Sequence, residues 1–90
     1  MKVQYSRRAL GELDGIYARI AKDSPRAARE QRNLIGGALK RLRRSPSLGK
    51  QTDVAAIRKL VIGKGRYAAY YSIEKNFIVI VRILRTRQNQ

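Results

Sequence analysis

A nearly unbroken apolar run lies near the C-terminus of this chain and reads Phe77-Ile78-Val79-Ile80-Val81-Arg82-Ile83-Leu84. The run is rich in β-branched residues and is too short for a typical helix, so it predicts a β-strand. Because apolar residues occupy both alternating sets of positions, we expect this strand to be the central one and to be covered on nearly both faces.

Two more strands are expected before this run. Residues 67–73 read Tyr-Ala-Ala-Tyr-Tyr-Ser-Ile, and residues 56–62 are apolar apart from Arg58 and Lys59. The segment 63–65, Gly-Lys-Gly, separates the two and is typical of a tight turn. The C-terminal half therefore predicts a three-stranded antiparallel meander.

Helical periodicity governs the N-terminal half. Between residues 7 and 22 the large apolar side chains recur at the spacing of one helical face, at Leu10, Leu13, Ile16, Tyr17 and Ile20. Ser6 precedes this pattern and is the expected N-cap, because its hydroxyl can accept a hydrogen bond from a first-turn amide. Before it, the short segment 3–5 is β-prone and predicts a first strand.

A second helix is expected to follow almost at once. Proline is favoured at the first position of a helix, so Ser24-Pro25 predicts a new start capped by Ser24. The helix should run to about residue 44 and present an inner face of Ala28, Gln31, Ile35, Ala38, Leu39 and Leu42. Two helices joined by so short a break fold back as an αα-hairpin. Gly36 and Gly37 each cost ~1 kcal/mol relative to alanine inside a helix, and we expect them to permit close approach of the two helices.

The predicted fold is a single α+β domain over residues 1–90, because a chain of this length forms one core. Its order is β-α-α-β-β-β, with a helical hairpin at about 7–44 packed on one face of a sheet that lies mainly within 54–84. A hydrophobic share of 43% is enough for such a core.

Charge is the strongest compositional feature. Lys and Arg number 21 against 6 Asp and Glu, which gives a formal net charge of +15. Self-repulsion at this density destabilises a compact chain, so the excess points to a polyanionic partner. Nucleic acid, an acidic protein and an anionic membrane surface all meet that description.

Several classes of function are disfavoured by what the composition lacks. The chain has no cysteine and no histidine, which leaves no disulfide, no common zinc ligand and no serine-type triad. The six carboxylates are scattered, so neither a metal site nor another cofactor is expected. No segment has the length and apolarity of a signal or membrane span, so we expect a cytoplasmic protein with no membrane partner.

Arginines and tyrosines within the predicted strands are the candidate binding residues. Arg82 interrupts the apolar run and needs a partner or a groove, unless it emerges on a solvated face; Arg58 poses the same question. Tyr67 and Tyr71 share one face of their strand, and Tyr70 points to the other. With Arg66 and Arg82 these rings could stack on nucleobases, or they could be ordinary core and edge aromatics of a sheet.

The order and spacing of several segments resemble the RelE/ParE toxin superfamily of type II toxin–antitoxin systems. The resemblance spans nearly the whole chain and rests on 5–10 with Leu13 and Ile16, on 24–28, on Leu42 with Pro46, Leu48 and Gly49, on 57–60, on 67–71, and on 80–84 before a terminal Arg-x-Arg. It implies the fold predicted above and a cognate antitoxin that wraps and neutralises the toxin in a hetero-oligomeric complex.

The superfamily has two branches with different mechanisms. RelE-like members are ribosome-dependent mRNA endonucleases, and that reading would make Arg58, Arg66, Arg82 and Arg87 catalytic, with phosphate binding and charge stabilisation as their roles. ParE-like members inhibit DNA gyrase and are not known as nucleases.

This sequence departs from the nuclease pattern. Ala68 follows Tyr67 where RelE-like chains commonly have arginine, and no tyrosine occurs after Tyr71. Arg85 stands where ParE-like chains often have histidine. The resemblance therefore favours a non-enzymatic, ParE-like gyrase inhibitor, with the expected target-binding residues Arg58, Arg66, Tyr70, Arg82, Arg85 and Arg87. An mRNA endonuclease and a plain nucleic-acid-binding module remain the alternatives.

Overall fold

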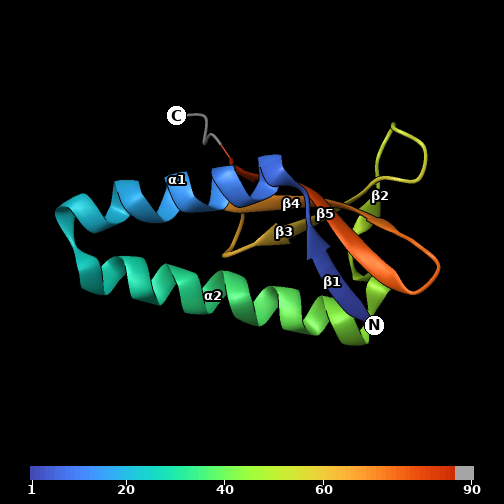
Figure 1. Ribbon diagram of the computed structural model, residues 1–90, viewed down its shortest axis with the longest axis horizontal. Helices are drawn as coiled ribbons and strands as arrows, with labels where there is room; N and C mark the ends of the chain where they lie inside the picture. Colours follow the sequence, from blue (N-terminus) through green and yellow to red (C-terminus); the bar gives the residue numbers. More distant parts are fainter. Residues whose placement is uncertain (87–90) are drawn as a thin grey trace.

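The computed structural model describes residues 1–86 and contains a helical hairpin packed on one face of a five-stranded sheet (Figure 1). The elements in chain order are β1 (Lys2–Tyr5), α1 (Arg7–Asp23), α2 (Pro25–Arg44), the 3₁₀ helix η1 (Pro46–Leu48), β2 (Lys50–Gln51), β3 (Arg58–Ile62), β4 (Tyr67–Ile73) and β5 (Phe77–Arg85). The predicted α+β class and β-α-α-β-β-β order are confirmed. The two-residue strand β2 is an addition that the sequence pattern did not indicate.

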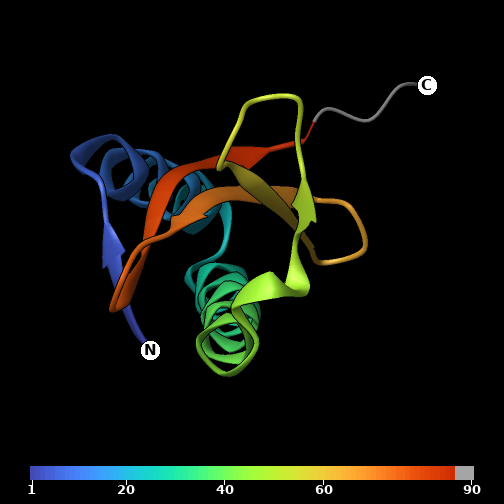
Figure 2. The ribbon, with the colours of Figure 1, turned by 90° about the vertical axis from the view of Figure 1, so that its right-hand side faces the viewer.

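The strands lie in the order β1-β5-β4-β3-β2. β1 pairs parallel with β5, while β5, β4, β3 and β2 form successive antiparallel pairs. The antiparallel meander is therefore confirmed, but its central strand is β4. Figure 2 views the hairpin nearly end-on, with both helices on the same side of the sheet.

The expectation that the last strand is covered on both faces is wrong. Ile78 and Ile80 are fully buried, whereas Phe77 and Val79 on the opposite face are only partly buried. The physical reason is that one helical hairpin covers one face of the sheet, and the described residues supply no second layer.

A β-bulge in β5 explains the arginine within the apolar run. Tyr70 pairs with Arg82 and Tyr71 with Ile80, so Val81 is an extra residue on this strand. An extra residue reverses the alternation of side chains beyond it. Ile83 therefore returns to the core, and Arg82 lies on the face opposite to it.

Both predicted helix caps are confirmed. The Ser6 hydroxyl accepts a hydrogen bond from Ala9 N at 2.9 Å, and the Ser24 hydroxyl accepts one from Ala27 N at 3.0 Å, with Pro25 at the first position of α2. The predicted inner face of α1 is wrong at Leu10, which is 47% exposed. The neighbouring Ala9 is the residue that this helix buries completely.

Two local expectations also fail. A Cβ built on Gly36 or Gly37 meets no atom within 4 Å, so these glycines do not serve close approach of the helices. The predicted strand at 56–62 begins only at Arg58. Ala56 has a φ of 68°, and the Thr52 side chain bonds Val54 N at 3.1 Å and Ile57 O at 2.9 Å to hold the preceding residues as a loop.

Candidate functional site

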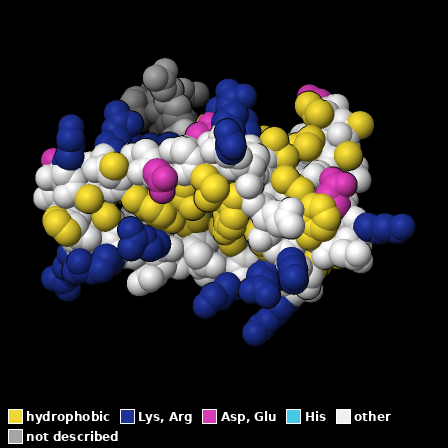
Figure 3. Space-filling model, in the orientation of Figure 1, with side chains coloured by type: hydrophobic (Ala, Val, Ile, Leu, Met, Phe, Trp, Pro, Cys, Tyr) yellow, Lys and Arg dark blue, Asp and Glu magenta, His cyan; other side chains and the backbone are white. Residues whose placement is uncertain are grey.

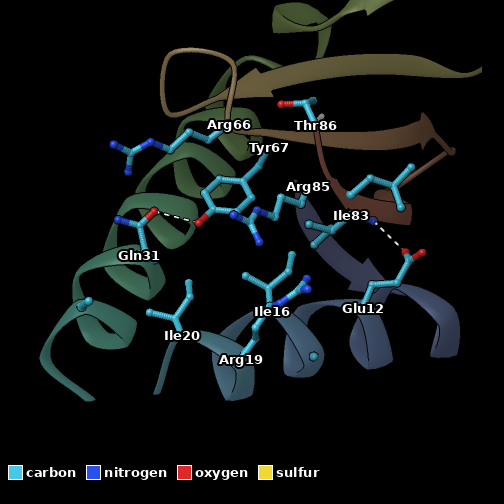
Figure 4. A pocket seen from close by; sticks show the side chains of 13 residues that line it. Glu12, Ile16, Arg19, Ile20, Gln31, Arg66, Tyr67, Ile83, Arg85 and Thr86 are labelled. Carbon is cyan, nitrogen blue, oxygen red and sulfur yellow. Dashed lines mark hydrogen bonds between the residues drawn. The ribbon is translucent and has the colours of Figure 1, made fainter. Parts of the chain in front are cut away.

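A groove of about 1090 Å³ opens where the helical hairpin meets the end of the sheet (Figure 4). Its walls come from α1, the beginning of α2, the beginning of β4 and the end of β5. The partly exposed Ile16 and Ile20 contribute apolar surface, and the fully buried Ile83 lies behind it. Arg19, Arg66 and Arg85 line it with exposed cationic side chains.

Tyr67 is a buried wall of this groove. Its side chain is 4% exposed, and its hydroxyl donates a hydrogen bond to Gln31 Oε1 on α2 at 2.8 Å. The bond satisfies the polar end of a ring that otherwise lies in the core. Tyr67 and the fully buried Tyr71 are thus core aromatics, whereas Tyr70 is half-buried on the opposite face, as the alternation predicts.

Glu12 fastens α1 to the edge of β5. Its carboxylate accepts hydrogen bonds from Ile83 N and Arg82 Nε, each at 3.0 Å, and from the Arg82 terminal nitrogen. These bonds are needed because β1 pairs with β5 only as far as Ile80. Past that point the Ser6 hydroxyl donates to Val81 O at 2.7 Å, and Glu12 satisfies the next free amide.

The environment of Glu12 keeps it ionised. Burial alone would raise its pKa, but the hydrogen bonds from Arg82 and Ile83 and the positive charges of Arg82 and Arg8 lower the pKa below its ordinary value. The carboxylate and the Arg82 guanidinium form an ion pair. Glu12 therefore does not offset the charge of the groove arginines.

Strand pairing brings two of the groove arginines to one place. Tyr67 pairs with Arg85, so Arg66, which immediately precedes β4, lies at the same end of the sheet as Arg85. Thr86 ties the segments together, because its amide donates to Arg66 O at 2.8 Å and its hydroxyl bonds Gly65 O. Among the described residues the groove combines apolar walls with a net positive charge.

The sequence-predicted site residues do not form one cluster. Arg66 and Arg85 line the groove, and Arg82 lies beside it, paired with Glu12. Arg58 is elsewhere and donates to Gly49 O at 2.6 Å and Ser47 O at 3.3 Å.

The remaining two predicted residues lie away from the groove or cannot be placed. Tyr70 is on the outer face of the sheet, with Lys59 Nζ 5.8 Å from its ring centroid. Arg87 lies outside the described residues.

Sequence reasoning missed four polar residues of this site: Glu12, Arg19, Gln31 and Thr86. Arg19 had a usable signal, because it lies between Ile16 and Ile20 on the apolar side of its helix. Gln31 was placed on the inner face of α2, but nothing in the sequence indicated its tyrosine partner. Glu12 gave no such signal, since its partner Arg82 is 70 positions away.

Two structural surveys bear on other classes of site. No three or more Asp, Glu, His or Cys side chains within residues 1–86 come together in a way that could hold a metal ion. Over the same residues, neither helix has the length and apolarity needed to cross a membrane.

Comparison with known proteins gives consistent results. The family described as "ParE toxin of type II toxin-antitoxin system, parDE" matches residues 3–90. Y4kP of Sinorhizobium fredii (strain NBRC 101917 / NGR234), which is named as a candidate toxin, is 31% identical over 87 residues and is matched across 97% of this chain and 90% of its own length. A chain of the solved chromosomal ParDE TA system from P. aeruginosa has the same fold, with a TM-score of 0.84, 24% identity and 97% coverage of each chain.

The molecule is therefore a toxin of a type II toxin–antitoxin system. Within that class, the chain belongs to the ParE toxin family. The resemblance to the RelE/ParE superfamily, and the preference for its ParE-like branch, are confirmed.

Proposed function

We propose that this ParE-family toxin inhibits DNA gyrase by binding rather than by catalysis, and that a cognate antitoxin neutralises it by occupying the basic groove. The observation that carries the antitoxin assignment is the combination of apolar walls with Arg19, Arg66 and Arg85 in one open groove. The family membership supports the gyrase assignment. Gyrase as target implies action in the cytoplasm.

The chemistry of the groove suits an acidic, amphipathic segment of a polypeptide. Its volume of about 1090 Å³ exceeds the ~300–1,000 Å³ that is typical of small-molecule sites. An apolar face of the segment could cover the partly exposed Ile16 and Ile20. Carboxylates on its other face could form charge-assisted hydrogen bonds with the arginines, which favour such partners.

The positions of the other arginines favour a non-enzymatic toxin over the RelE-like alternative. Phosphoryl chemistry without a metal requires cationic groups that converge on the reacting phosphate. Arg58 lies on the same face of β3 as the buried Leu60 and Ile62, and its guanidinium donates to a backbone carbonyl. Arg82 lies on the opposite face of the sheet and is paired with Glu12.

A supercoiling assay with purified toxin and gyrase tests the proposed target. Relaxed plasmid should remain relaxed as the toxin is titrated, because gyrase is held inactive. Full supercoiling at saturating toxin would contradict the proposal. Cleavage of a message bound to ribosomes in a parallel assay would establish the endonuclease alternative instead.

A charge-reversal pair tests the groove. Arg66→Glu with Arg85→Glu should weaken capture of the antitoxin, taken as the small protein encoded beside this gene, by at least about tenfold, because two charge-assisted contacts become repulsive. Lys50→Glu with Lys75→Glu, at two exposed positions outside the groove, is the charge-matched control and should bind as wild type. Unchanged binding by the groove variant would place the antitoxin elsewhere.

A further inference from the structure

We propose that the solvent-exposed face of α2 is a second binding surface, separate from the groove, and that it docks against the sugar–phosphate backbone of duplex DNA. This goes beyond the proposed function, because it requires neither the antitoxin nor gyrase. It rests on the distribution of charge between the helices, on the geometry of α2 and on two glycines without a structural role inside the chain.

The cationic excess is concentrated on one helix. Of the 20 residues of α2, seven are Arg or Lys and one is acidic: Arg26, Arg29, Arg32, Lys40, Arg41, Arg43 and Arg44, against Glu30. The 17 residues of α1 carry four cations, Arg7, Arg8, Arg19 and Lys22, against three acids, Glu12, Asp14 and Asp23. Helix-dipole complementarity favours cations in the last turn only. It does not account for those near the beginning of α2.

Four of the seven cations of α2 form an exposed stripe along one side of the helix, in one group near each end. Arg26, Arg29, Lys40 and Arg44 share one side of the helix, opposite the buried Ile35 and Leu42, and all four are exposed. A helix of this length extends about 30 Å, and dark blue side chains project along the margin that it forms in Figure 3. Within residues 1–86 the only ion pair on this helix joins Arg26 to Glu30, at 3.8 Å and with both side chains largely exposed.

Gly36 and Gly37 lie in the middle of α2, between the two groups of cations. Each costs ~1 kcal/mol relative to alanine in a helix. Apart from the neighbouring backbone of α2 itself, no atom lies within 4 Å of where either Cβ would be. Internal packing therefore gives no reason for them. Because these two positions have no side chains, the backbone of α2 can come close to another molecule. The arginines and the lysine on either side can then extend beyond the backbone and contact that molecule.

The composition of this face favours nucleic acid over an acidic protein. Protein interfaces have an apolar, aromatic-rich core from which charge is depleted, whereas protein–DNA interfaces are polar and strongly positive. α2 contains no aromatic residue. That absence disfavours single strands, whose binding depends on base stacking.

The shape of the helix favours DNA over RNA. The major groove of B-DNA, about 12 Å wide, admits an α-helix, whereas the major groove of duplex RNA is deep and narrow. The exposed face of α2 has cations toward both ends and glycines in the middle. Such a helix can enter the DNA major groove while its cations contact the phosphates on either side. Contacts from these arginines and the lysine to phosphates carry no sequence information, so binding through them should depend little on sequence.

Fluorescence anisotropy with a short duplex DNA tests this proposal on the purified full-length toxin. The triple variant Arg29→Ala, Lys40→Ala, Arg44→Ala should lose at least about tenfold in affinity, and its log–log salt slope should fall by about 3, since each lost phosphate contact removes ~0.9. The matched control is Arg7→Ala, Lys22→Ala, Lys75→Ala, which removes the same charge from exposed positions elsewhere and should lose less than about threefold. Thermal melts establish that both variants are folded.

Several outcomes would overturn the proposal. They are the absence of salt-dependent binding, an equal loss in both triple variants, and binding to duplex RNA, single strands or anionic vesicles as tight as to duplex DNA. The groove variant Arg66→Glu, Arg85→Glu should bind DNA with less than about tenfold loss, because its substitutions lie outside the stripe. Failure of the DNA surface is thereby distinguishable from failure of the antitoxin groove.

Discussion

Gly49 has less space around it than any other glycine of the described residues. A Cβ there would lie 2.8 Å from Lys59 O and 2.8 Å from the Tyr71 ring and hydroxyl. The same hydroxyl accepts a hydrogen bond from Gly49 N at 2.8 Å and donates one to Pro46 O at 2.6 Å. Because Tyr71 is fully buried, the segment after α2 is attached directly to the core.

Glycine substitutions at two positions should therefore have opposite effects. Gly49→Ala should lower the free energy of unfolding by about 1–3 kcal/mol, because overpacking displaces Tyr71 or the β3 backbone. Gly36→Ala should raise it by up to about 1 kcal/mol, because the helix gains propensity and the new methyl group meets no atom. Urea titrations of the two variants measure both effects. A neutral Gly49→Ala would show that the loop does not pack against Tyr71 as described.

Glu12 should make stability depend on pH. Its pKa is lower in the folded state than its ordinary value of 4.5. Its contribution is therefore complete above about pH 4.5 and is lost as the pH falls through the lower, folded-state pKa. Glu12→Gln should cost about 2 kcal/mol at neutral pH, because the charged acceptor of Arg82 is removed.

Urea titrations over an acid pH series measure this dependence. The wild type and the Gln variant should approach each other in stability as the pH falls, since wild-type Glu12 becomes neutral. A constant difference between them at every pH would contradict the assigned role of the carboxylate.

Ser6 holds two elements together, whereas Ser24 only caps a helix. Both hydroxyls accept a hydrogen bond from a first-turn amide, but Ser6 also donates to Val81 O, next to the bulge in β5. Ser6→Ala should therefore cost about 2 kcal/mol and Ser24→Ala about 1 kcal/mol of unfolding free energy. Equal losses in thermal or urea unfolding would mean that the bond to β5 contributes nothing.

The sequence predicts features whose interacting residues are close along the chain and misses those whose partners are far apart in sequence. The helices and their caps were predicted because Ser6 and Ser24-Pro25 act within one turn. The strand at 67–73 was predicted with its observed bounds because its alternation and flanking turns are local. The bulge at Val81 and the pairing of Glu12 with Arg82 depend on partners far along the chain, and no local pattern encodes them.

The candidate site was predictable only in part for the same reason. Arg66 and Arg85 were identified as isolated cations, but only strand pairing brings them to one groove. Arg58 and Tyr70 were chosen by the same reasoning and lie elsewhere. Residue type identified the candidates, whereas topology determined which of them meet.

At the scale of the whole molecule, a thin domain with a net charge of +15 presents two distinct basic surfaces. One is the groove, where arginines surround apolar walls; the other is the outer side of α2, where cations lie on a helix face without apolar bulk. The first suits an amphipathic protein segment and the second suits a phosphate backbone. The topology of the chain thus divides the excess of positive charge between two surfaces of different character.

Amide hydrogen exchange on the toxin, alone and in complex with its co-expressed antitoxin, shows whether the antitoxin occupies the groove. An antitoxin segment in the groove should slow exchange around residues 15–20 of α1, at Arg66 and Tyr67, and at residues 84–86, while the outer side of α2 remains unchanged. If protection is confined to α2 or to the β2–β3 loop, and exchange around the groove is as fast as in the free toxin, the antitoxin does not occupy the groove.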